Sequence, residues 1–126
     1  MIRIVALLAF IIACTDSTDP SDVVQFRFQE EISSQILHVR ISNESVVRDA
    51  EQLMQSGEPR WLIGRPVRGN GDFNTGWAWH LDPASISFAE VTIEACQSAA
   101  GVVGDDLDYW IGFGQVCIWG VVRERE

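Results

Sequence analysis

A chain of 126 residues, of which 47% are hydrophobic, is long enough for one small domain with its own core. Its formal net charge is −9, and all of its basic residues are arginine. Because an acidic surface with scattered arginines repels phosphate backbones, this composition argues against nucleic acid as a partner. The chain has two histidines and no esterase, phosphate-loop or zinc-protease motif, so no enzyme class is indicated.

The first 14 residues have the pattern of an export signal. Arg3 precedes ten apolar residues, Ile4 to Ala13, and the run ends at Cys14. It is too short for a membrane-spanning helix, which needs about 20 residues. The tetrad ending at Cys14 resembles the lipobox of bacterial lipoproteins, in which the cysteine is lipidated and becomes the mature N-terminus. We therefore expect a signal peptide over residues 1–13 and a lipid on Cys14, with a plain secreted protein as the alternative.

A polar, acidic stretch separates this leader from the rest of the chain. Residues 15–22 contain only Ser, Thr, Asp and one Pro, which is the composition of a solvated linker. We expect the lipidated cysteine and linker, residues 14–22, to precede a single domain over residues 23–126. A lipid on Cys14 would make the membrane a partner and would place the domain in the cell envelope, facing the periplasm or the exterior.

The first element expected in the domain is a β-hairpin. Apolar and polar residues alternate over residues 24–28 and again over residues 37–41, with the period of half-buried strands. Residues 30–35 would connect the two strands.

An amphipathic helix is expected next, over residues 44–55. Apolar residues recur there at helical spacing, with charged and amide residues on the opposite side. Asn43 or Ser42 can cap its start, and Gly57 can end it. We expect the apolar stripe to pack on the core and not to form a binding face.

The remainder of the domain is expected to be mostly β. The alternation changes phase after Phe88, which predicts a bulge near Ala89–Glu90. Residues 69–76 have the composition of a loop. Residues 97–115 are ambiguous, and 105–111 are compatible with a short helix. One helix packed on a mostly antiparallel sheet is an α+β fold. Strands are expected over residues 60–67, 77–81, 86–93 and 116–123.

Two cysteines remain when Cys14 is assigned to a lipid. Cys96 and Cys117 form an even pair in a chain expected in an oxidising compartment, which favours a disulfide between them. The alternative is two unpaired thiols that pack as small core residues.

The segment from Asn74 to Pro83 reads Asn-Thr-Gly-Trp-Ala-Trp-His-Leu-Asp-Pro. It is similar to the N-terminal domain of the calmodulin-binding protein BP-seventy-four and its bacterial relatives. The resemblance covers about residues 23–124 and includes the Leu-Met-Gln-Ser-Gly end of the predicted helix. Ile118 stands where the family usually has Pro between Cys and Trp, and Gln97 stands where Asp usually follows the first Cys.

This resemblance implies little about activity, because most bacterial members of the family have none assigned. Calmodulin binding is not carried over to this chain. A calmodulin target is typically a basic amphipathic helix, whereas the predicted helix has Arg48 against Glu44, Asp49 and Glu51. An exported lipoprotein would also not meet calmodulin.

Aromatic and titratable residues gather over residues 77–82, and two further tryptophans could join them in space. Aromatic walls with one histidine and one carboxylate suit a sugar, a peptide or another small ligand. The tryptophans could equally fill the core, and His80 could brace the turn at Asp82–Pro83. The candidate binding residues are Trp77, Trp79, His80, Asp82, Trp110 and Trp119.

Three functions are compatible with these residues. The first is a lipid-anchored envelope domain that binds an envelope protein or a small ligand. The alternative is a small hydrolase that uses His80 and a nearby carboxylate, Asp82 or Glu90. The third is a purely structural envelope lipoprotein. No cofactor or metal is expected, because the acidic loop at 72–74 lacks the features of a calcium loop.

Overall fold

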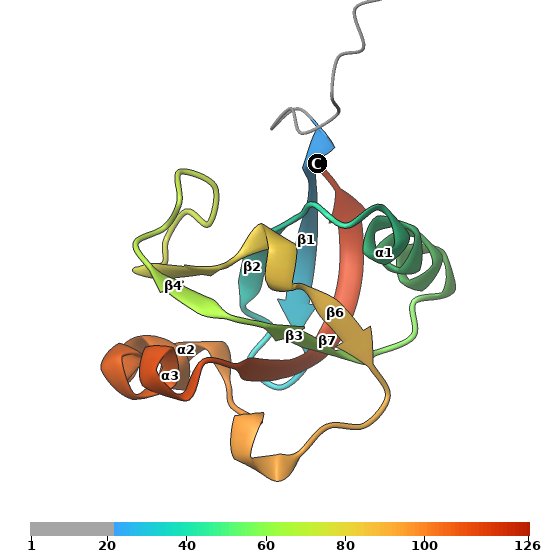
Figure 1. Ribbon diagram of the computed structural model, residues 1–126. Coiled ribbons are helices and arrows are strands. Elements are labelled where there is room, and N and C mark those ends of the chain that lie inside the picture. The colour runs from blue at the N-terminus through green and yellow to red at the C-terminus, as the bar shows by residue number, and fades with distance from the viewer. Residues whose placement is uncertain (1–21) are drawn as a thin grey trace, which may run out of the picture.

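A computed structural model describes residues 22–126 as an α+β domain (Figure 1). Its main sheet has five strands in the order β2-β1-β7-β3-β6, and every neighbouring pair is antiparallel. A second sheet contains β4 and β5 only. The expected fold class, a mostly antiparallel sheet with an amphipathic helix packed on it, is confirmed. The predicted signal peptide, Cys14 and almost all of the linker lie outside the described residues.

The N-terminal hairpin forms where the alternation predicts it. β1 (Val24–Glu30) pairs with β2 (Ile36–Ile41), and Phe26 lies opposite Val39. On the other side of β1 lies β7 (Val116–Arg125). The inward side chains of β1 and β2 are buried, which explains the alternation in the sequence.

Helix α1 (Glu44–Ser56) matches the predicted amphipathic helix to within one residue. The Asn43 side chain accepts hydrogen bonds from the backbone N–H groups of Ser45 and Val46 at the N-terminus. Gly57 ends the helix in the left-handed conformation, with φ 70°, and its N–H donates to the Leu53 carbonyl. The apolar stripe packs against the core, as expected.

The strand predicted over residues 60–67 is two strands in two different sheets. β3 (Arg60–Gly64) lies between β7 and β6 in the main sheet, whereas β4 (Pro66–Arg68) pairs with β5 (Trp79–Leu81). The chain changes sheets at Arg65, whose N–H donates to the Ser85 hydroxyl at 2.8 Å and whose carbonyl accepts from the Asp82 N–H at 2.9 Å. These bonds satisfy the backbone at the break.

The bulge predicted near Ala89–Glu90 is wrong, because the strand ends there. β6 (Ser87–Ala89) has three residues, and its last pair is Ala89 with Trp61. Beyond it, Val91 is 83% exposed and Ile93 is 63% exposed. The alternation around Val91 and Ile93 therefore does not reflect burial against a sheet. The chain leaves the sheet here and leads to the 3₁₀ turn η3 (Glu94–Cys96).

Residues 97–115, which the sequence left ambiguous, contain two short helices. These are α2 (Ala100–Asp105), which was not expected, and α3 (Leu107–Phe113), which overlaps the stretch 105–111 that was compatible with a short helix. Helices of this length show no complete apolar stripe, and tertiary packing stabilises them. No helix within residues 22–126 is long and apolar enough to span a membrane. The side chains that α2 and α3 bury are Ala100, Val103, Leu107 and Trp110.

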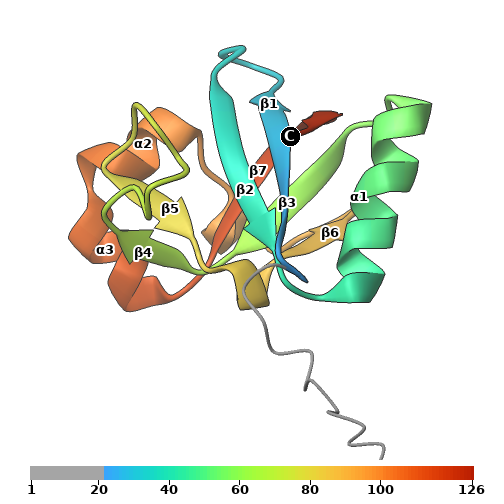
Figure 2. The ribbon, with the colours of Figure 1, turned by 90° about the horizontal axis from the view of Figure 1, so that it is seen from above.

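The remaining elements gather at two ends of the main sheet. In Figure 2, α1 lies to the right of its strands, and α2, α3 and the β4–β5 hairpin lie to the left. Gly120 of β7 allows β1 to come close, because a Cβ there would lie 2.1 Å from the Gln29 carbonyl oxygen.

Candidate functional site

Trp77 and Trp79 pack inside the domain. The Trp79 side chain has 0% exposure, and the Trp77 ring meets it edge-on, with 5.8 Å between ring centroids. Trp77 is half-buried, and its Nε1 donates to the Ile36 carbonyl at 2.8 Å. The Trp79 Nε1 has no hydrogen-bond partner, and it is the one such buried side-chain atom in the described part of the chain. Trp79 therefore belongs to the core, and Trp77 packs against it.

His80 is tied to the loop that follows β4. Its Nδ1 lies 2.7 Å from the Gly69 carbonyl oxygen, and its ring meets Phe73 edge-on at 5.2 Å. The pairing of β4 with β5 places His80 opposite Val67. The hydrogen bond therefore holds residues 69–73 against β5, and not the turn at Asp82–Pro83 that the sequence suggested.

The carboxylates proposed to act with His80 have other partners. Asp82 accepts from the Ala84 N–H at 3.1 Å and forms an ion pair with Arg65. Glu90 pairs with Arg60 at 3.3 Å. Within residues 22–126, no carboxylate forms an ion pair with His80. Within this region, the hydrolase alternative therefore has no ion pair between His80 and a carboxylate.

The remaining candidate tryptophans lie apart from this cluster. Trp110 is buried in α3, where its ring meets Tyr109 edge-on at 5.1 Å. Trp119 lies in β7 directly opposite Trp61 of β3. The six residues singled out from the sequence therefore do not form one site.

Trp119 and Trp61 form the wall of a different site. Their ring centroids are 5.2 Å apart with an interplanar angle of 57°, and both side chains are half-buried. Their strand neighbours Leu62 and Ile118 are fully buried, so the two indoles project from the opposite face of the sheet. The pocket beside them has a volume of about 250 Å³, and its other walls are Glu30, Ile32, Gln97, Ser98 and Ala99.

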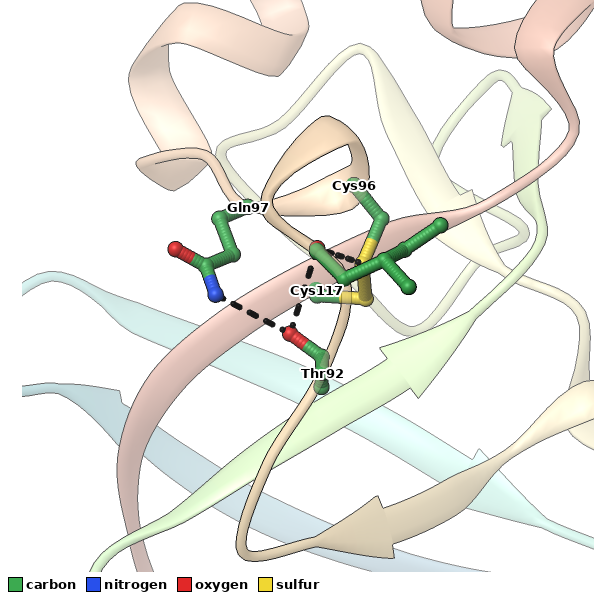
Figure 3. The surroundings of a disulfide bond; sticks show 5 residues. Thr92, Cys96, Gln97 and Cys117 are labelled. Carbon is green, nitrogen blue, oxygen red and sulfur yellow. Dashed lines mark hydrogen bonds between the residues drawn. A yellow bond between two sulfur atoms is a disulfide. The ribbon is translucent and has the colours of Figure 1, made fainter.

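A disulfide holds one wall of this pocket in place. Cys96 is bonded to Cys117, with 5.1 Å between their Cα atoms, as the sequence favoured (Figure 3). Next to the bond, the Ser98 N–H donates to the Cys117 carbonyl at 3.0 Å. Gln97 also forms an isolated bridge with Cys117. Residues 97–99 therefore lie alongside β7, two residues from Trp119.

The pocket contains one buried carboxylate, that of Glu30 at the end of β1. Glu30 is 2% exposed. Its Oε2 accepts from the Ser33 hydroxyl at 2.6 Å and from the Ala100 N–H, the first residue of α2, at 3.3 Å. This position suits a negative charge, because the first N–H groups of a helix lack partners within the helix.

The family model of the BP-seventy-four N-terminal domain matches residues 22–125. The chain belongs to the BP-seventy-four N-terminal domain family. The match covers almost all of the region that the structure describes and confirms the resemblance seen in the sequence. Comparison with curated proteins and with solved structures gives no match.

Of the residues lining the pocket in this BP-seventy-four domain, the sequence pointed only to Trp119 and missed six: Glu30, Ile32, Trp61, Gln97, Ser98 and Ala99. The sequence does carry a signal for Glu30, because this residue continues the two-residue spacing of Phe26 and Phe28 along one face of the strand. The structure buries all three side chains. Trp61 lies in a predicted strand, but its partner depends on the pairing of β3 with β7, which local sequence does not specify.

Two other hollows of the BP-seventy-four domain lie along α1, with volumes of about 510 and 440 Å³. Exposed acidic, hydroxyl and amide side chains form much of their lining, without an aromatic pair. Within residues 22–126, no three His, Cys, Asp or Glu side chains converge as a metal site would require. The Trp61–Trp119 pocket, defined by the residues named above, is therefore the candidate site.

Proposed function

We propose that this chain is a lipid-anchored binding module of the cell envelope, with the Trp61–Trp119 pocket as its binding site. The observation that carries the proposal is a pair of half-buried indoles in a pocket that the buried residue Glu30 also lines. Tryptophan offers a large rigid apolar surface, and a few polar groups at the same place would orient a ligand.

The rigidity of the pocket supports a binding role. Two walls are adjacent antiparallel strands, and the third is a segment held by a disulfide next to its pocket residues. Walls of this kind change little when a ligand enters, so little conformational entropy is lost on binding.

The anchor is tested by fractionation. Cys14→Ser should move the protein from the membrane fraction to the soluble fraction, because the lipid would have no attachment site. Ser17→Ala, in the same linker, should leave the protein in the membrane fraction. Membrane association of Cys14→Ser that survives detergent partitioning would contradict the lipoprotein part of the proposal.

The pocket is tested by affinity capture from envelope extract with the whole protein immobilised. A Trp61→Ala/Trp119→Ala double variant should lose components that the wild-type protein retains. Tyr109→Ala is the matched control, because Tyr109 is an exposed aromatic residue on α3 and does not line the pocket. Thermal melts should show that all variants are folded. Equal retention by the wild-type protein and the double variant would contradict a binding role for the pocket.

A further inference from the structure

We infer that the Trp61–Trp119 pocket takes a positively charged group, an ammonium or guanidinium group carried on a side chain or a small molecule. The inference rests on the proposed binding function and gives it a ligand class. Three features carry it: the charge of Glu30, the acceptor character of the neighbouring polar groups, and the indole pair.

Glu30 is a buried carboxylate without a cationic partner. The ion pairs within residues 22–126 involve other acidic residues, and no arginine of this region reaches Glu30. The nearest arginine in sequence to the indole pair is Arg60, which pairs with Glu58 and Glu90. A buried charge is costly unless an opposite charge accompanies it. A cation in the pocket would supply that charge.

One oxygen of Glu30 is available to a ligand. Both of its hydrogen bonds within the described region are accepted by Oε2, and Oε1 has none. Trp79 Nε1 is the one enclosed side-chain atom of this region that lacks a partner, so Oε1 is not enclosed. Because Glu30 lines the pocket, we infer that Oε1 meets solvent there.

The other polar side chains of the pocket also favour a hydrogen-bond donor. Gln97 donates through Nε2 to the Thr92 hydroxyl at 3.3 Å, and Figure 3 shows its side-chain oxygen directed away from that bond. Ser98 donates its hydroxyl hydrogen to the Ala99 carbonyl at 3.2 Å, which leaves its oxygen as an acceptor. Ammonium and guanidinium groups donate and cannot accept, so they match this set.

The indole pair favours the same ligand class. A cation within about 6 Å of a tryptophan ring is attracted by the ring face, and tryptophan gives the strongest interaction of this kind. The volume of about 250 Å³ lies below that of most drug-sized pockets. The pocket therefore suits one head group or one side chain. The acidic net charge of the chain would raise the local concentration of cations.

The inference is tested with neutral and charged probes of the same shape. The pair is N-acetyl-arginine methylamide and N-acetyl-citrulline methylamide, because citrulline replaces guanidinium by neutral urea. N-acetyl-lysine methylamide extends the test to ammonium. The whole lipidated protein in a non-ionic detergent is titrated, and tryptophan fluorescence and the NMR signals of the indole N–H groups are followed. We expect the arginine probe to bind about tenfold more tightly than citrulline.

Glu30→Gln removes the negative charge of the side chain and keeps its size and one carbonyl acceptor. It therefore tests the contribution of charge separately from that of shape. This variant should remove the preference for arginine over citrulline. Equal affinity of the two probes for the wild-type protein, or an unchanged preference in Glu30→Gln, would overturn the inference. So would the absence of binding by both cationic probes. The wild-type comparison needs no variant, so the test holds even if Glu30→Gln fails to fold.

Failure of this inference can be told apart from failure of the proposed function. If retention from envelope extract depends on Trp61 and Trp119 but arginine gives no advantage over citrulline, the binding function stands and the cationic ligand class is wrong. If retention does not depend on these tryptophans, the proposed function itself fails.

Discussion

Two pairs of tryptophans in this domain have similar geometry and different surroundings. The ring centroids are 5.8 Å apart in the Trp77–Trp79 pair and 5.2 Å apart in the Trp61–Trp119 pair. In the first pair Trp79 is fully buried and Trp77 half-buried, whereas both members of the second are half-buried and line a pocket of about 250 Å³. Contact between two indoles therefore does not identify a binding site, and the elements that cover them make the difference.

The covering elements differ in a simple way. Trp79 lies beneath α2, where a Cβ at Gly104 would be 3.5 Å from the Trp79 Nε1. Trp77 donates to the hairpin backbone at Ile36. The Trp61–Trp119 pair is half-buried, and the 97–99 segment, which follows the disulfide, lines the same pocket.

The largest difference between the two pairs should appear in stability. Trp79→Ala should lower the free energy of unfolding by about 3–5 kcal/mol, because it leaves a cavity at a fully buried site. Urea denaturation of the purified protein measures it. Trp119→Ala is the matched comparison and should cost clearly less, since its side chain keeps contact with solvent. Equal losses at the two positions would contradict the distinction between core and pocket.

Removal of the disulfide, which lies beside the Trp61–Trp119 pocket, should have the next largest effect. The Cys96→Ser/Cys117→Ser variant lacks the bond that constrains the unfolded chain across a separation of 21 residues. Its free energy of unfolding should therefore be lower by about 3 kcal/mol. Thermal melts with and without reductant measure it, and reductant should not affect the double variant. Mass spectrometry of the unreduced protein gives an independent check, since two free thiols at these positions would refute the bond.

A smaller loss is expected at Asn74, which lies on the Trp79 side. Asn74 is buried, accepts from the His38 N–H at 3.0 Å and donates to the Trp79 carbonyl at 2.8 Å. Asn74→Ala should lower stability by about 2 kcal/mol, because it leaves buried backbone groups without partners. Denaturation measures the loss. Asn70→Ala is the control, since Asn70 caps an exposed turn, and a larger loss there would contradict this view of the loop.

The smallest effect is expected at His80. His80→Ala removes one exposed hydrogen bond to Gly69 and should lower stability by about 1 kcal/mol at most. Binding of the arginine probe should be unchanged, because His80 does not line the Trp61–Trp119 pocket. A thermal melt and a titration of the same sample measure both quantities. Normal melting with lost binding would show that His80 serves a ligand.

Patterns within one element predicted that element well. The hairpin and α1 follow from alternation, helical spacing and the caps Asn43 and Gly57, all of which lie within a few residues of the elements that they define. The short helix α2 could not be predicted in this way, and α3 only in outline, because long-range packing of residues such as Val103 stabilises them. The loop over 69–76 looked polar, yet it buries Phe73 and Asn74.

The sequence by itself determined the family, the α+β class, the cysteine pair and the elements with strong local patterns. The tertiary structure alone decided that one predicted strand divides between two sheets at Arg65 and that Trp61 lies opposite Trp119. The reason is physical. Local periodicity reports which side chains of one element are buried, whereas a pocket depends on pairing between strands far apart in the chain. Here that pairing joins residues 30, 61, 97 and 119, which no local pattern connects.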